Sequence, residues 1–164
     1  MSIHVKKILV AKDLTKEASN VIRYALELGA KFDAELYVLH VMPTVDPAVL
    51  NMVALNMGAD KLEKFNAENE ASLAEQTKEQ LHEILKTETD LLESDLKHEP
   101  QVEVHHGDPV SLILTSADRL DADMIVLGAH SKGRLHYAFL GSVAERILRK
   151  THRVVVIVPP NAGH

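Results

Sequence analysis

The sequence contains no cysteine and no tryptophan, and only 4% of its residues are aromatic. Without cysteine there are no disulfides, no thiolate nucleophiles and no cysteine-ligated zinc or iron–sulfur sites, and a cytoplasmic location is favoured. No apolar run approaches the roughly 18 residues that a membrane-spanning helix needs, and the run before Asp13 is too short for a signal peptide. We therefore expect a cytoplasmic protein that has no membrane partner.

The length of 164 residues is that of one ordinary domain. Hydrophobic residues make up 46% of the chain and charged residues 26%, which is typical of a globular protein. No internal repeat or low-complexity tract marks a second domain. We expect a single domain over residues 1–160, followed by a short C-terminal tail at 161–164.

The net charge of −6 is distributed unevenly along the chain. Residues 60–99 hold 12 acidic side chains and five lysines, a net charge of −7, so the remainder carries about +1. Between Gly128 and Arg153 there are six Lys or Arg and a single acidic residue, Glu145. The acidic total argues against a nucleic-acid partner, whereas the basic, glycine-containing segment favours a small anionic ligand.

Short apolar segments predict five buried strands. They are Lys7–Ala11, Glu35–Val41, residues 102–106, Asp123–Leu127 and Val154–Val158. Helical periodicity or helix-start signals predict four helices between the strands. These are a helix through Ala18–Gly29 with Thr15 as N-cap, one from Lys61 to about Lys97, one starting at Pro109 behind Asp108, and one from Ser142 to about Lys150.

The last of these helices shows the Ser-x-x-Glu spacing of a capping box, from Ser142 to Glu145. Residues 43–60 contain two prolines and an apolar stretch, and they fit a loop, a helical turn or an arm packed on a partner. The alternation of strands and helices predicts an α/β protein with an open, doubly wound, five-stranded parallel sheet of order 3-2-1-4-5.

Ligands of such sheets bind beyond the carboxyl ends of the strands, where the strand order reverses. Asp13 follows the first strand, and Gly128 begins the loop after the fourth. Gly141 and Ser142 offer amides at a helix N-terminus, which favours an anion. The loop is not a Walker A motif, because Arg134 and Leu135 stand where Lys and Ser or Thr are required, and no Gly-x-Gly-x-x-Gly is present.

The sequence resembles the universal stress protein family over residues 5–159. That family is marked by Gly-x-x-Gly, nine residues, and Gly-Ser or Gly-Thr after the fourth strand, and part of its membership binds ATP or AMP. Gly128 and Gly141-Ser142 keep the required spacing, and residues 107–109 resemble the family's Gly-x-Pro turn. Two positions depart from the pattern: Ser131 replaces the second glycine, and Ala11 stands where nucleotide-binding members often have proline.

The resemblance implies a three-layer, Rossmann-like sandwich of the adenine-nucleotide α-hydrolase type that binds ATP or AMP, with Mg²⁺ as an accompanying ion. Adenine and ribose are expected near Asp13 and Val41, and the phosphates near the glycine loop and the helix that follows it. The predicted nucleotide site comprises Ala11, Asp13, Val41, Leu127, Gly128, His130, Ser131, Gly141, Ser142 and Val143.

The last strand is rich in β-branched residues and is predicted to lie at an edge of the sheet, where an unprotected strand tends to pair with another chain. The resemblance implies a homodimer joined through this strand. Its interface residues are Val154, Val155, Val156, Ile157 and Val158.

Several alternatives accompany these expectations. Asp13 also fits a plain helix start, and His130 a solvated loop residue. His105 and His106 lie next to each other on a strand and point to opposite faces, which disfavours a shared metal ion. No nucleophile with an adjacent base is present, so no catalytic residue is predicted beyond slow ATP hydrolysis. A family member without ATP that serves as a dimeric interaction module, for a protein partner that the sequence does not identify, is the alternative function.

Overall fold

The computed structural model describes residues 2–11, 18–42, 47–129 and 140–160. Helices and strands follow one another in chain order as β1 (Lys7–Ala11), α1 (Ala18–Phe32), β2 (Glu35–Met42), α2 (Pro47–Met57), α3 (Ala59–Asp90), β3 (Gln101–His106), α4 (Pro109–Leu120), β4 (Met124–Gly128), α5 (Ser142–Lys150) and β5 (Val154–Val158). All five strands lie within one residue of their predicted positions.

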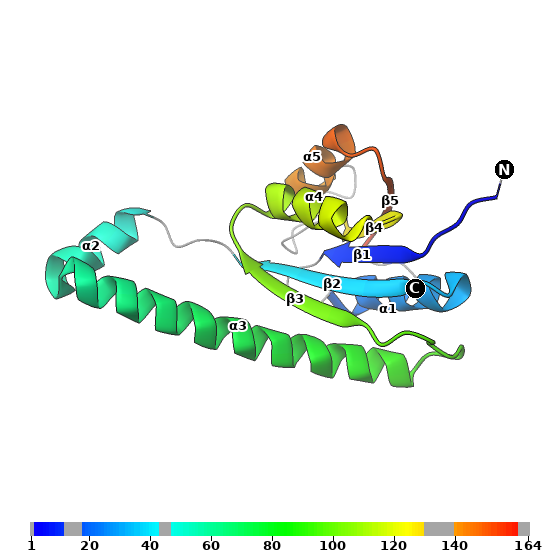
Figure 1. The fold of residues 1–164 in the computed structure, drawn as a ribbon, viewed down its shortest axis with the longest axis horizontal. Coiled ribbons are helices and arrows are strands. Elements are labelled where there is room, and N and C mark those ends of the chain that lie inside the picture. The colour runs from blue at the N-terminus through cyan, green and yellow to red at the C-terminus, as the bar shows by residue number, and fades with distance from the viewer. Residues whose placement is uncertain (1, 12–17, 43–46, 130–139, 161–164) are drawn as a thin grey trace.

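The five strands form one parallel sheet of order β3-β2-β1-β4-β5, which confirms the predicted α/β fold. In Figure 1, α4 and α5 lie above the sheet and α1 and α3 below it. Successive side chains of a strand point to opposite faces, so Ile8 and Val10 of β1 face α1 while Leu9 and Ala11 face α4 and α5. The result is a three-layer sandwich.

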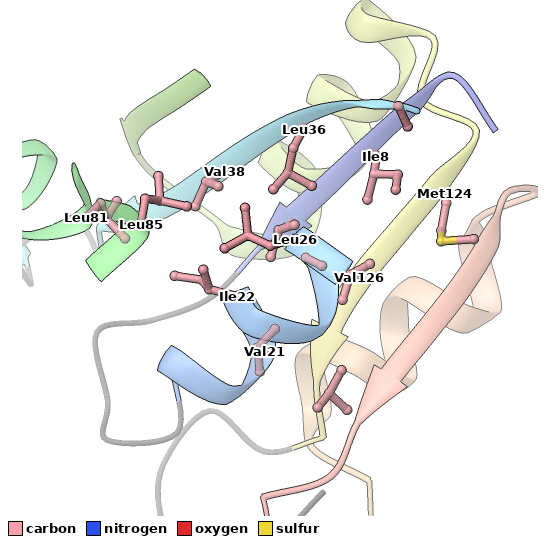
Figure 2. Close-up of a cluster of buried hydrophobic side chains, with 14 of the residues drawn as sticks. Ile8, Val21, Ile22, Leu26, Leu36, Val38, Leu81, Leu85, Met124 and Val126 are labelled. Atoms are coloured by element: carbon pink, nitrogen blue, oxygen red, sulfur yellow. The ribbon is translucent and has the colours of Figure 1, made fainter. Parts of the chain in front are cut away.

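The lower core is built between the sheet, α1 and the second half of α3 (Figure 2). Ile8, Ile22 and Leu26 are completely buried, and Leu81 of α3 is 1% exposed. The upper core joins the other face of the sheet to α4 and α5, with Ile125 and Ile147 completely buried. Each face of the sheet therefore has its own apolar layer, as a buried parallel sheet requires.

The amino-terminal edge of the sheet is fixed by Asp123, which precedes β4. Its Oδ2 accepts hydrogen bonds from the backbone amides of Lys6, at 2.8 Å, and Lys7, at 3.0 Å. Its own amide donates to the Lys7 carbonyl at 2.9 Å. These bonds hold the start of β1 against the start of β4, at the end of the strands opposite to the predicted ligand site.

The predicted end of the acidic helix near Lys97 is wrong, because α3 ends at Asp90. The amides of Leu91 and Leu92 donate to carbonyls three residues back, which tightens and ends the last turn. The chain then turns back, and Leu92 and Leu96 pack against the lower core. The position of Leu92 in the predicted helical pattern therefore reflects its burial in the segment that returns to the core, and not a longer helix.

The unassigned segment of residues 43–60 contains α2, which packs on α3. Together, α2 and the first half of α3 project beyond the sheet, as Figure 1 shows. We call Pro47–Met57 with residues 59–74 the arm. Among the described residues, no helix is both long and apolar enough to cross a membrane.

Candidate functional site

The strand order reverses between β1 and β4, and the residues predicted there lie side by side. Ala11 and Leu127 are direct partners in the register of these strands, and they are 7% and 3% exposed. Both belong to the upper core cluster, against which Val41, Leu140 and Val143 also pack. The structure thus brings together the predicted apolar residues Ala11, Val41, Leu127 and Val143, which come from four separate segments of the chain.

The two ends of the glycine loop meet at the carboxyl edge of β4. The amide of Ala129 donates to the Val158 carbonyl of β5 at 3.0 Å, and the Ala129 carbonyl accepts from the Gly141 amide at 2.7 Å. This second bond holds the start of α5 next to the end of β4. Ala129 was missed by sequence reasoning, because a backbone hydrogen bond leaves no signature in residue type.

The helix α5 begins without a side-chain cap, so the predicted capping box is wrong. Gly141 is the N-cap, with φ −61° and ψ 154°, and no side chain among the described residues accepts a hydrogen bond from the first turn. Ser142 is instead the first helical residue and is exposed, while Glu145 forms an ion pair with Arg149. Because glycine has no side chain to cap with, the amides of the first turn remain available to an anion.

One of the two amides that the sequence predicted for an anion, that of Gly141, is already used within the protein. The Gly141 amide already donates to Ala129, and the first intrahelical bond runs from the Glu145 amide to the Gly141 carbonyl at 3.0 Å. The amides of Ser142, Val143 and Ala144, which come between them, therefore precede the first intrahelical bond and are the donors at this helix start that suit an anion. The positive end of the helix dipole adds to their attraction for an anion.

The carboxyl ends of β2 and β3 continue the same edge of the sheet. Val41 is half-buried and lies opposite His105 in the register, and the Gly107 amide donates to the Met42 carbonyl at 3.1 Å. Asp108 then caps α4, as predicted: its Oδ2 accepts from the Ser111 amide at 2.9 Å. These hydrogen bonds from the Ser111 amide and hydroxyl hold the pKa of Asp108 below its usual range.

The described basic residues at the end of the Gly128–Arg153 segment do not form a single patch. Arg153 precedes β5 and so lies at the amino ends of the strands, away from the predicted ligand site. There it pairs with Asp118 at 3.1 Å. Arg149 pairs with Glu145 within α5, and Arg146 lies 3.9 Å from Asp108. Of these three arginines, Arg146 is therefore the one that lies near the carboxyl ends of the strands, where the site is predicted.

Asp13, His130 and Ser131, and the predicted N-cap Thr15, lie outside the described residues. Among the residues that the structure does describe, no group of three or more His, Asp or Glu is arranged to hold a metal ion. His105 forms its contact with Glu103 instead, 3.3 Å away. The described part of the site thus consists of an apolar floor and a helix N-terminus.

Comparison with known proteins relates this geometry to a family. A model of the universal stress protein family matches residues 4–159. Universal stress protein MJ0531 of Methanocaldococcus jannaschii is 30% identical over 153 residues, covering 93% of this chain and 81% of that protein. Universal stress protein MJ0577 of the same organism is 27% identical over 162 residues, covering 96% of this chain and 97% of that protein.

Solved structures give the same result for the fold. A structure of MJ0577 matches with a TM-score of 0.70 and 24% identity, covering 96% of this chain and 97% of that one. A universal stress protein in complex with cAMP matches with a TM-score of 0.59 and 19% identity, covering 96% of this chain and 99% of that one. With the family model matching nearly the whole sequence, the chain belongs to the universal stress protein family.

Proposed function

We propose that this chain binds an adenine nucleotide, ATP or AMP, and acts as a dimeric stress-response switch. The observation that carries the proposal is the 2.7 Å hydrogen bond from the Gly141 amide to the Ala129 carbonyl. It holds an uncapped helix N-terminus at the point where the strand order reverses, and this is the kind of position where phosphates bind in open α/β sheets.

In this proposal the ligand has an apolar and an anionic half, each with its own partners. Adenine and ribose lie over Ala11, Val41 and Leu127 with Asp13 beside them. The phosphates meet Gly128, the amides of Ser142 and Val143, and the side chains of His130, Ser131 and Ser142. The match to a universal stress protein solved with cAMP supports an adenine nucleotide as the ligand class.

The bound nucleotide works as a signal rather than as a metabolite to be converted. ATP with Mg²⁺ beside Asp13 undergoes at most slow hydrolysis, which acts as a timer on the bound state. The readout passes through a homodimer in which β5 pairs antiparallel with the same strand of a second copy. The edge position of β5 and the 58% exposure of Val154 support this pairing. A cytoplasmic location stays a prediction.

The test begins with freshly purified protein. The chain is denatured, the precipitate removed, and any released nucleotide identified by absorbance and chromatography. Release of about one adenine nucleotide per chain, or binding of added ATP or AMP with Mg²⁺, is the expected result. Protein that is empty and also fails to bind both added nucleotides would contradict the proposal.

The second candidate function is a dimeric interaction module that does not use ATP. The specific observation in its favour is the arm, whose helix α2 contains no buried residue although most of its side chains are apolar. An empty, non-binding protein in the nucleotide assay would shift the assignment to this function.

A further inference from the structure

The starts of the helices α4 and α5, which both lie above the sheet in Figure 1, are held on either side of the strand β1. The Ala129 carbonyl, just after β4, accepts from the Gly141 amide and so holds the start of α5. The Met42 carbonyl, at the end of β2, accepts from the Gly107 amide just before α4. In the sheet, β1 lies between β2 and β4. The two helix starts therefore flank the carboxyl end of β1, where the strand order reverses.

An ion pair joins these two helix starts. Nη1 of Arg146 in α5 lies 3.9 Å from Oδ1 of Asp108, the N-cap of α4. Asp108 uses its other carboxylate oxygen, Oδ2, to accept from the amide and the hydroxyl of Ser111, both at 2.9 Å. The oxygen that faces Arg146 is thus not the one that caps the helix. Arg146 can leave the pair while both capping hydrogen bonds stay in place.

The pair between Arg146 and Asp108 is a weak one. Its 3.9 Å separation is longer than the roughly 2.7 to 2.9 Å of a charge-assisted hydrogen bond, whereas Arg149 of the same helix holds Glu145 at 2.5 Å. The side chains of Arg146 and Asp108 are 51% and 48% exposed, so water screens their attraction. A phosphate offers a guanidinium two oxygens at once, and is therefore a stronger partner for Arg146 than this single carboxylate oxygen.

The position and the charge of Arg146 suit an anion at the start of α5. Arg146 stands one helical turn after Ser142 and shares its side of the helix, because residues four apart are neighbours on a helix surface. Helical side chains lean toward the N-terminus, which brings the guanidinium toward the amides of the first turn. The hydrogen bonds from Ser111 are the main cause of the lowered pKa of Asp108, and the charges of Arg146 and Lys150 lower it further. Two cations thus face one carboxylate.

We propose that Arg146 binds a phosphate of the nucleotide at the start of α5, and that Asp108 competes with this phosphate for the guanidinium. Arg146 thereby becomes a specificity-determining residue of the site in the proposed nucleotide function, on which this role rests. Without a ligand, Arg146 pairs with Asp108. With a nucleotide bound, Arg146 turns to the phosphate, and Oδ1 of Asp108 is left to water. Adenosine has no phosphate and gains nothing from Arg146, so the residue selects nucleotides over nucleosides.

The first experiment compares the binding of ATP and adenosine, both with Mg²⁺, by calorimetric titration. The proteins are wild type, Arg146→Gln and the control Arg149→Gln, which removes the same charge two turns from the helix start. The affinity for ATP is expected to fall about tenfold or more in Arg146→Gln, because a charged contact to phosphate is lost, and to change little in the control. The affinity for adenosine is expected to be the same in all three proteins.

The outcomes of this comparison separate two kinds of failure. Equal affinities of Arg146→Gln and Arg149→Gln for ATP would overturn the role of Arg146, and so would a loss for adenosine as large as the loss for ATP. In both cases the wild type still binds the nucleotide, so the proposed function stands. A wild type that binds neither ATP nor adenosine contradicts the proposed function, and the role of Arg146 with it.

The second experiment removes the competing carboxylate. Asp108→Asn keeps a capping oxygen without the charge, and its affinity for ATP is expected to rise by about two- to fivefold. The control Asp118→Asn loses a carboxylate that pairs with Arg153 at the other end of the strands, and should bind ATP as wild type does. In the double variant Arg146→Gln/Asp108→Asn the gain should shrink, because no guanidinium is there to be released. No gain in Asp108→Asn, or an equal gain with and without Arg146, would overturn the competition.

Discussion

The guanidinium of Arg23 in α1 holds the carboxylate of Glu88 in α3 through two hydrogen bonds, of 2.8 Å from Nε to Oε2 and 3.3 Å from Nη2 to Oε1. The Glu88 side chain is 5% exposed and that of Arg23 is 48% exposed. The hydrogen bond to Glu88, together with its charge, raises the pKa of Arg23. The pair therefore fastens the long helix to the lower layer.

Replacing Arg23 with Met is expected to lower the free energy of unfolding by about 1 to 3 kcal/mol, because Glu88 is left nearly buried without its partner. Screening of the half-exposed guanidinium by water argues for the lower part of this range. Urea titration measures the change. The double variant Arg23→Met/Glu88→Met is expected to recover part of the loss, since no carboxylate remains unpaired. A double variant that is less stable than Arg23→Met would contradict this explanation.

Gly107, in the turn after β3, is expected to tolerate no side chain. Its φ is +146°, and an added Cβ would lie 3.1 Å from Cδ1 of Leu112. Gly107→Ala should reduce stability by about 1 to 3 kcal/mol through backbone strain. The matched control is Gly29→Ala in α1, where a Cβ would make ordinary contacts at 3.7 Å and 3.8 Å. Alanine favours the helix there, so thermal unfolding should separate the two variants in opposite directions.

The cap at Asp108 is expected to make stability depend on pH. Its pKa is lowered in the folded protein, so the unfolded chain takes up the proton first as the pH falls. The contribution is complete above about pH 4, the usual pKa of Asp, and is lost as the pH falls through the lower folded value. Urea midpoints of wild type and Asp108→Ala should therefore converge in acid. Asp108→Asn keeps a capping oxygen without a charge, so its midpoint should not follow the same titration.

Ser142 offers a way to remove one ligand donor without unfolding the helix. It is the first residue of α5, a position that proline favours, and Gly141 before it has an extended conformation that suits a following proline. Ser142→Pro should leave the melting temperature nearly unchanged but weaken ATP binding by about tenfold or more, because an amide to a charged phosphate is lost. Calorimetric titration measures the affinity.

The control for this change is Ser142→Ala, which keeps the amide and removes the hydroxyl. Its loss of affinity is expected to be smaller than that of the proline variant. If the proline variant bound ATP as tightly as wild type, the phosphates would not meet the start of α5.

A lysine on β5 is expected to block pairing through that strand. Val154 is 58% exposed at the sheet edge, and charged side chains at such edges prevent strand addition. Val154→Lys should sediment with a smaller mass than wild type, toward the 18.2 kDa of one chain if no other contact remains. Ile3→Lys, at a position 84% exposed before β1, is the control and should keep the wild-type mass. Equal masses for both variants would exclude the β5 dimer.

Most of the fold could be predicted from the sequence, because each buried strand is a short apolar run next to a helix-start or turn signal. Lys7–Ala11 and Val154–Val158 are found at their predicted bounds, and Asp108 with Pro109 marks the start of α4 as observed. In these segments, local preference and tertiary packing favour the same structure.

Three features could not be predicted from the sequence: the helix α2, the end of α3 and the uncapped start of α5. Each depends on tertiary contacts that leave no local sequence pattern. The helix α2 has no polar face to give it a helical period, so its sequence fits several structures. The end of α3 depends on Leu96 packing against the core, and no Gly or Pro marks the turn. In the site, the bond between Gly141 and Ala129 joins two backbone groups, so the uncapped start of α5 became visible only in three dimensions.

The continuity of α3 has a mechanical consequence for the molecule. Thr77 is buried, and its hydroxyl lies 3.9 Å from the sulfur of Met42, at the end of β2 beside Val41. From Thr77 to Ala59 the helix extends for about 27 Å without a break. A rigid rod of this length, pivoting at Thr77 by about 10°, moves its far end by about 5 Å. A tilt of α3 caused by a small shift at the strand end would therefore be enlarged at the tip of the arm.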